Sequence, residues 1–380
     1  MKSIPFNKPY LTGKETQYIE ESVKCGKISG NGLFTNKCQD FFNHKYGFKK
    51  SLLTTSCTDA LEMAAILCNL EYGDEVIVPS YTFVSTALAF VRQGAKIVFA
   101  DSYPFHPNID ADKIEQLITS HTKAIVPMHY AGMSCDMDKI MFIAKKYNLI
   151  VIEDAAQAID SYYKKKPLGS IGHLATFSFH ETKNIISGEG GLLAINDEKF
   201  TRRAEIIWEK GTNRMEYFRG EIDKYGWVDI GSSFLPSEII AAFLLAQIEN
   251  LDLIQNKRKK IWNLYYRGLE PLFNAGLIQI PNIPKFATNN AHIFYIVCNN
   301  IEERKSLILS LKSNGVMAVF HYQSLHKSAY YLKTNEYVNL PNSENFSNCL
   351  LRLPLYYELK KHEVSRIIDL IIDFYTKNKS

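Results

Sequence analysis

The chain has 380 residues, of which 46% are hydrophobic and 22% are charged. This length and composition can bury an ordinary globular core and divide into two domains, which excludes fibrous and disordered proteins. The net charge of +4 arises from 44 basic and 40 acidic residues spread along the sequence, which argues against a nucleic-acid-binding protein and suits a phosphorylated small molecule better.

The opening segment, MKSIPFNKPYLTGKETQ, lacks the apolar core of a secretory signal, and no later segment has the uncharged apolar length needed to span a bilayer. The seven cysteines form no C-x-x-C pair and no metal-ligand spacing with histidine. We therefore predict a cytoplasmic protein without disulfides, without a bound metal and without membrane contact.

Short apolar runs rich in β-branched residues alternate with helical patterns in the first part of the chain. The runs predict buried strands at 74–79, 95–101, 123–132 and 149–158. Two segments, 56–70 and 135–148, begin with N-cap residues and continue with apolar side chains at helical spacing. The alternation predicts an α/β fold with a mainly parallel sheet covered on both faces.

The pattern changes beyond about residue 235. Residues 236–272 predict one long or broken helical connection. Strand-like runs and helices then follow a Pro-rich turn, with strands at 292–298 and 316–322 and helices at 302–314 and 361–376. We therefore predict a large α/β domain over 1–245 and a smaller α+β C-terminal domain over 246–380.

A lysine stands between two core strands near the middle of the chain. The strand-like run 175–179 stops at a histidine, an acid and Lys183, and a glycine cluster leads into a second apolar run, 192–195. Strand 149–153 ends on Glu153 and Asp154, where ligands sit in open α/β sheets. Asp154 is alternatively the N-cap of the segment that follows it. If both groups lie beyond strand ends, the amine and the carboxylate meet at one rim of the sheet.

Two further segments suggest a phosphate contact and a ring contact. The hydroxyl-rich turn TTSCTDAL (54–61) runs into a helix whose free N–H groups would attract an anion, so that Cys57 and Thr58 could hold a phosphate. Simple helix capping is the alternative. Phe83 follows a strand and could present its face to a flat ring, although an aromatic residue in this position also fits an ordinary core.

Together these groups are the parts needed to hold pyridoxal 5'-phosphate (PLP). A lysine amine forms a Schiff base with the aldehyde. A carboxylate beside the pyridine nitrogen keeps that nitrogen protonated and makes the ring an electron sink, while phosphate and stacking contacts orient it. Lys183 is the predicted Schiff-base residue.

The motifs EDAAQA, SFHETKN, GEGG, VPSYTFVST, HYAG and FHYQSLH resemble those of the DegT/DnrJ/EryC1/StrS sugar-nucleotide aminotransferases. The resemblance runs from IPFNKP to RLPLYY, nearly the whole chain, and the motifs are specific in combination. It implies a fold-type-I PLP-dependent transferase. It also implies a role for each matching residue: Lys183 as the Schiff-base lysine, Asp154 as the pyridinium partner, Gln157 beside the ring hydroxyl, Phe83 as the stacking aromatic, and Cys57, Thr58 and Ser178 as the phosphate cradle.

One motif departs from the family pattern. Many members carry G-x-N-x-R after a long loop, with an asparagine that reaches the phosphate in the neighbouring subunit. Here the stretch 231–235 reads GSSFL, with Ser233 at the asparagine position and Leu235 at the arginine position. A serine hydroxyl can still donate to phosphate across a dimer, whereas nothing replaces the arginine.

Substrate contacts are predicted for two groups of residues. Lys210, Arg214 and Arg219 lie in a polar, aromatic-flanked loop that could meet a diphosphate, and a solvated surface loop is the alternative. His129, His321 and His326 follow or flank strand-like segments, and histidines hydrogen-bonded in the interior explain them equally well.

The stretch 209–238 resembles family members that move an amino group from L-glutamate to C4 of dTDP-4-dehydro-6-deoxy-D-glucose, giving dTDP-4-amino-4,6-dideoxy-D-galactose for enterobacterial common antigen. The resemblance implies a homodimer with shared active sites that cycles between PLP and pyridoxamine 5'-phosphate (PMP). A relative giving the equatorial 4-amine or acting on a 3-keto sugar is the alternative.

Two other readings fit the residues less well. Relatives that dehydrate the sugar at C3 carry histidine in place of the Schiff-base lysine, so Lys183 argues against that reaction. A non-catalytic PLP-binding protein would not need to retain Asp154, Gln157 and Lys183 together.

Overall fold

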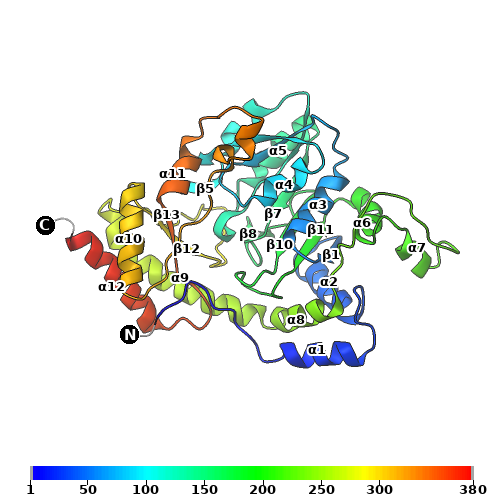
Figure 1. Cartoon of the computed structure of the whole chain (residues 1–380), viewed down its shortest axis with the longest axis horizontal. Helices are drawn as coiled ribbons and strands as arrows, with labels where there is room; N and C mark the ends of the chain where they lie inside the picture. Colours follow the sequence, from blue (N-terminus) through cyan, green and yellow to red (C-terminus); the bar gives the residue numbers. More distant parts are fainter. Residues whose placement is uncertain (1–2, 378–380) are drawn as a thin grey trace.

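The computed structural model describes residues 3–377 and is built around a seven-stranded sheet (Figure 1). Six strands point in one direction, whereas β11, which lies between β1 and β10, runs antiparallel to both of its neighbours. The predicted mainly parallel α/β sheet is confirmed. The strand order is β1(Lys50–Thr54), β11(Gly191–Ile195), β10(Leu174–Ser178), β7(Ile150–Asp154), β6(Thr122–Ile125), β2(Glu75–Pro79) and β3(Lys96–Ala100).

Helices cover both faces of this sheet because its strands are apolar on both sides. In β2, Val76 and Val78 pack into one hydrophobic core and Ile77 into the other. One face carries α3(Cys57–Leu67), α4(Ser85–Val91) and α6(Thr201–Trp208), and the other carries α2(Leu33–Tyr46), α5(Met137–Tyr147) and α8(Glu238–Ile248). Helix α1(Glu15–Lys24) packs on α8.

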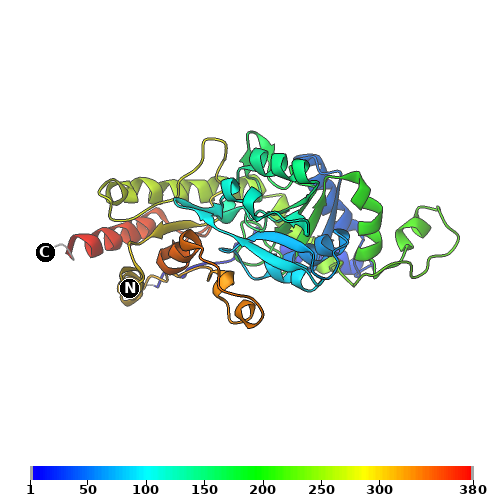
Figure 2. The same cartoon turned by 90° about the horizontal axis from the view of Figure 1, so that it is seen from above.

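Short elements complete the large part of the molecule. Two hairpins form from β4(Ser102–Tyr103) with β5(His106–Ile109) and from β8(Tyr162–Tyr163) with β9(Lys166–Pro167). Helix α7(Arg214–Phe218) lies in an arm that extends away from the rest of the chain, on the right of Figure 1 and again in Figure 2. Exposed aromatic side chains mark this arm: Trp227 is 85% exposed and Phe218 61%.

The C-terminal part is a smaller layered unit at the opposite end from the arm (Figure 1). Helix α8 ends at Ile248 and α9(Leu251–Asn274) follows, so the predicted helical connection is a broken one. The antiparallel pair β12(Phe294–Val297) and β13(Leu350–Leu353) packs with α9, α10(Ile301–Ser313) and α12(Lys361–Lys377), and α11(Pro341–Cys349) leads into β13. None of the described helices is both long and apolar enough to cross a membrane.

The strand predicted over 316–322 does not form. Val316 makes an isolated bridge to Ile4, and Val319 makes one to Arg352. Because the two bridges reach different partners, no continuous ladder develops, and the segment stays extended without belonging to a sheet. The bridge at Ile4 also carries the N-terminal segment into the C-terminal core. We keep a division of the chain into two domains near residue 245 as a proposal. The N-terminal segment around Ile4 packs with the smaller, C-terminal domain.

Candidate active site

A cavity of about 540 Å³ opens beyond the carboxyl ends of β7 and β10, between the large and small parts of the chain. Its lining brings together residues as far apart in sequence as Phe6 and Leu355, because strand ends of the sheet form one wall and segments of the C-terminal part form the other. Eight of the predicted site residues lie on it: Cys57, Thr58, Phe83, Asp154, Gln157, Ser178, Lys183 and His321.

Lys183 stands in the turn that links β10 to β11. Its backbone N–H donates to the carbonyl of His180 (2.8 Å), while its amine has no hydrogen bond or ion pair with any residue of the described chain. Burial lowers the pKa of this amine, and the nearby carboxylate of Asp154 partly opposes that shift. A buried amine without a partner is suited to covalent capture of an aldehyde.

The glycines after Lys183 let this turn approach helix α3. A Cβ atom at Gly191 would lie 2.4 Å from the backbone carbonyl carbon of Ser56, so no side chain fits there. The close approach places the lysine turn beside the N-terminus of α3. The GEGG segment therefore has a packing role in shaping the cavity.

Asp154 is the last residue of β7 and is 3% exposed. Its Oδ2 accepts a hydrogen bond from the Thr86 hydroxyl (2.6 Å), and its Oδ1 accepts one from the N–H of Ala156 (3.1 Å). No helix begins after Asp154, so the alternative of a helix N-cap is wrong, and the bond to Ala156 closes a turn at the cavity wall. Burial raises the pKa of this carboxyl above its ordinary value, because the charged form has lost water. Thr86, which the sequence did not single out, is itself bonded to Thr82 (2.7 Å).

The floor of the cavity is the N-terminus of α3. Ser56 is the N-cap and accepts a hydrogen bond from the N–H of Asp59 (3.0 Å). The side chains of Cys57 and Thr58 border the cavity, and the Thr58 hydroxyl is 2.8 Å from that of Ser85. An eleven-residue helix directed at a cavity in this way offers N–H groups and a positive dipole end to an anion.

Phe83 and Gln157 occupy other walls. Phe83 is 56% exposed and borders the cavity, so it is not an ordinary core residue. Gln157 is buried, accepts from the N–H of Ala131 (2.7 Å) and donates to the Tyr322 hydroxyl (2.7 Å). An unpaired amine, a carboxylate, a helix N-terminus and an accessible aromatic ring therefore border one space, and this set of groups fits PLP.

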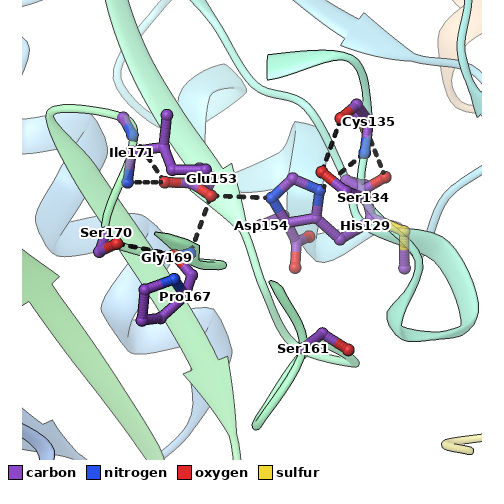
Figure 3. A network of polar contacts seen from close by, with 12 residues as sticks. His129, Ser134, Cys135, Glu153, Asp154, Ser161, Pro167, Gly169, Ser170 and Ile171 are labelled. Atoms are coloured by element: carbon purple, nitrogen blue, oxygen red, sulfur yellow. Dashed lines mark hydrogen bonds and ion pairs between the residues drawn. The ribbon is translucent and has the colours of Figure 1, made fainter. Parts of the chain in front are cut away.

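His129 does not reach this cavity. Its ring is fully buried, with Nε2 2.9 Å from Glu153 and Nδ1 accepting the N–H of Cys135 (3.2 Å) (Figure 3). The same carboxylate accepts the N–H groups of Gly169 and Ile171, each at 2.8 Å. The predicted substrate contact is not supported, because both ring nitrogens are occupied inside the fold. The alternative of a packed histidine describes His129.

The side chains of His326 and Arg219 also bind to other residues of the chain, away from the cavity. His326 is buried, with Nδ1 2.6 Å from the Ser80 hydroxyl and Nε2 3.3 Å from Glu344. Arg219 forms ion pairs with Glu205 (2.8 Å) and Glu221 (2.7 Å). Neither side chain borders the cavity, and their predicted substrate contacts are not supported within a single chain.

Lys210, Arg214 and Ser233 line a second hollow of about 260 Å³, separate from the cavity of Lys183. Lys27 and Asn31, from the loop between α1 and α2, complete its polar rim. The structure therefore brings these three predicted residues together, but away from the cofactor side of their own chain.

Three further cavity residues were not singled out from the sequence, because their roles depend on side chains that lie far away in the chain. Arg352 lies on β13, His292 precedes β12, and Tyr322 is the last residue of the extended segment 316–322. The only weak signal was an arginine within the apolar strand run 350–353, where a charge needs a partner. These residues border the same cavity as Asp154 and Lys183.

Comparisons with known proteins agree with this geometry. The model of the DegT/DnrJ/EryC1/StrS aminotransferase family matches residues 9–372. The chain is 32% identical to the GDP-perosamine synthase of Caulobacter vibrioides, over 95% of each chain, and 31% identical to that of Escherichia coli O157:H7, over 99% and 100%. A putative sugar aminotransferase from Streptococcus pneumoniae, solved in its PLP form, is 26% identical over 99% of each chain, with a TM-score of 0.90.

Proposed function

We propose that this chain, which belongs to the DegT/DnrJ/EryC1/StrS aminotransferase family, moves an amino group from L-glutamate to a keto carbon of a nucleotide-linked sugar. The chain is a PLP-dependent aminotransferase. The observation that carries the proposal is the unpartnered amine of Lys183 in the same cavity as the buried carboxylate of Asp154. The sugar class is supported by relatives named as sugar aminotransferases.

The residues divide the work between them. Bound PLP supplies an electron sink for the bonding electrons of the donor carbon. The Nζ atom of Lys183 removes the proton from Cα of the donor and later delivers a proton to the acceptor carbon. Asp154, held by the Thr86 hydroxyl, keeps a negative charge at the inner end of the site. The N-terminus of α3 holds the phosphate. Because one amine serves both halves, donor and acceptor occupy the cavity in turn.

Arg352 is the residue proposed to hold the donor. Its guanidinium donates from Nε and Nη2 to the carbonyl of Phe320 (3.3 and 3.0 Å) and lies 4.7 Å from the centre of the Phe6 ring. It forms no ion pair with a carboxylate of the described residues. A half-buried cation with only a neutral acceptor is stabilised by an anionic ligand. The carboxylate groups of L-glutamate supply that anion.

Replacing Arg352 by methionine is expected to raise KM for L-glutamate by roughly 10- to 100-fold, the loss expected for hydrogen bonds to a charged group. Steady-state kinetics with varied glutamate measures this. Arg267→Met, an exposed position on α9, serves as control and should behave like wild type. If KM for the sugar rose instead while KM for glutamate stayed the same, Arg352 would belong to the nucleotide diphosphate.

The proposed acceptor is dTDP-4-dehydro-6-deoxy-D-glucose, with amination at C4 to give dTDP-4-amino-4,6-dideoxy-D-galactose. The resemblance of residues 209–238 supports it. A GDP-linked sugar is the second candidate, because two relatives at 31% and 32% identity are named GDP-perosamine synthases. Incubating the enzyme with glutamate and either the dTDP- or the GDP-linked 4-keto-6-deoxy sugar, followed by NMR of the product, decides between them. Failure of both would refute both of these acceptors.

We further propose a homodimer with shared active sites. The second hollow, with Lys210, Arg214 and Ser233, would then border the cavity of the neighbouring subunit, and the exposed arm around Trp227 would pack on that subunit. Sedimentation analysis tests this, and a fully active monomer would contradict it. The seven unpaired cysteines suit the reducing cytoplasm that we propose as its compartment, which cell fractionation can check.

A further inference from the structure

Two histidines of the C-terminal part border the cavity and have no part in the reaction described above. His292 lies just before β12, and His321 lies in the extended segment after α10. Each ring uses its Nδ1 atom inside the protein and has no partner for Nε2 among the described residues. The surrounding hydrogen bonds fix which nitrogen of each ring carries the proton.

In His292 the proton lies on Nδ1. This atom is 2.9 Å from the side chain of Asn184. The amide nitrogen of Asn184 donates to the backbone carbonyl of Asn290 (2.9 Å) and to Gln255 (2.7 Å), which leaves the amide oxygen facing the histidine. An oxygen can only accept, so Nδ1 of His292 must donate. Its Nε2 therefore has a free lone pair and acts as an acceptor.

In His321 the arrangement is the reverse. Its Nδ1 is 2.6 Å from the hydroxyl of Tyr130, a fully buried side chain. The Tyr130 hydroxyl also lies beside the buried hydroxyl of Tyr81, whose own proton has no other acceptor among the described residues. Tyr81 therefore donates to the Tyr130 oxygen, because a buried hydroxyl proton without an acceptor carries a substantial cost. The phenol therefore donates to Nδ1, and the ring proton of His321 lies on Nε2. The ring is stacked on Tyr322 with centres 3.6 Å apart, which holds its orientation.

Both rings are neutral and close to the reacting amine. Burial lowers the pKa of each imidazole well below its usual value, and the charges of Arg352 and Lys183 lower both further. The cationic form, in which both nitrogens donate, is therefore disfavoured. The C-terminal wall of the cavity thus presents one fixed acceptor and one fixed donor to a ligand.

We propose that His292 and His321 recognise a ketone and a hydroxyl on neighbouring carbons of the sugar. Nε2 of His292 accepts the hydroxyl proton, and Nε2–H of His321 donates to the carbonyl oxygen. A vicinal hydroxy-ketone is the sugar feature that offers one donor and one acceptor side by side, which matches the fixed polarity of the wall. This inference rests on the proposed function and narrows its substrate class. Both histidines act as specificity-determining residues.

Calorimetric binding to the holoenzyme tests the pairing with two ligands: the nucleotide-linked keto sugar accepted by the enzyme, and its deoxy analogue with hydrogen in place of the hydroxyl beside the ketone. Wild type should bind the parent sugar about 10-fold more tightly, because the analogue leaves the acceptor unpaired. His292→Phe should lose this discrimination. His292→Gln, which restores an acceptor oxygen, should regain part of it.

The donor side has its own variants. His321→Phe should weaken binding of parent and analogue equally, by about 5- to 10-fold, because both retain the ketone. Tyr130→Phe keeps the ring of His321 but removes the hydroxyl that fixes its proton on Nε2. This variant should weaken binding of both sugars, by a smaller factor than His321→Phe does. His362→Phe, an exposed position on α12, is the matched control.

The possible outcomes distinguish failure of the histidine pairing from failure of the proposed function. If wild type binds both sugars equally, or if His292→Phe keeps the discrimination, the pairing is overturned while the proposed function stands. If wild type binds neither dTDP- nor GDP-linked keto sugars, the proposed function fails and the pairing with it. The wild-type comparison needs no variant, so a variant that does not fold leaves the inference testable.

Discussion

Replacing Lys183 by alanine is expected to reduce amino transfer by on the order of 10⁴-fold, the upper range for loss of a positioned acid–base group. The amine is the one proton carrier proposed for both halves of the reaction, and it stands unpaired in the cavity. The variant should still bind PMP, because the groups that hold the phosphate and the ring nitrogen remain in place. Product formation and equilibrium dialysis of PMP measure the two properties separately.

The matched control is Lys145→Ala, which removes an exposed lysine from α5 and should leave turnover unchanged. Adding a small primary amine to the Lys183→Ala enzyme should restore part of the activity, because a free amine can carry the proton through the emptied space. An alanine variant that turned over at the wild-type rate without added amine would remove Lys183 from its role.

Asp154→Asn is expected to lower turnover by about 10²- to 10³-fold, the loss seen when one preorganised electrostatic group is removed. Asparagine has the same shape but carries no charge to keep the pyridine nitrogen protonated. Asp110→Asn is the matched control: Asp110 is also a buried acid whose pKa is raised by burial, but it lies outside the cavity. An undiminished rate in the Asp154 variant would count against its assignment.

The pH dependence of cofactor binding gives a second test of Asp154. Because burial raises the pKa of this carboxyl in the free protein, it takes up a proton at a higher pH than an exposed aspartate does. PLP needs the charged form, so its affinity for the apoenzyme should fall as pH falls through that raised pKa. In the Asp154→Asn variant this loss of PLP affinity at low pH should be absent. Equilibrium dialysis of PLP over a pH series measures it.

Most of the large sheet could be predicted, because six of its seven strands, all except β1, are short apolar runs between turn residues. The limits of the prediction lie elsewhere. No helix or strand was assigned to residues 1–54, although α1, α2 and β1 form there, because their apolar residues pack on α8 and on an edge of the sheet far away in sequence. The segment 316–322 has a strand-like composition, but its partners, Ile4 and Arg352, decide that no ladder forms.

For the site, strand-end chemistry and the family resemblance together predicted a lysine, an acid and a phosphate-binding turn that do border one cavity. Histidines were harder to interpret, because identical rings serve different purposes. His129 is tied to Glu153 inside the fold, whereas His321 faces the cavity. A histidine is packed inside the fold when both ring nitrogens have protein partners, and it can face a ligand when one nitrogen has none. Those partners come from other parts of the chain, so the sequence around the histidine does not show them. Thr86 and Arg352 were missed for the same reason.

The cavity is built from two separate parts of the chain, so that its two sets of residues can change independently during evolution. The amine, the carboxylate and the phosphate-binding helix belong to the sheet, whereas Arg352, His292 and His321 come from the last third of the sequence. If His292 and His321 contact the sugar as proposed, mutations around these two residues can change which carbohydrate is accepted while Lys183, Asp154 and the proposed donor contact Arg352 stay in place. New sugar specificities become accessible by gradual change in one region, with turnover preserved along the way.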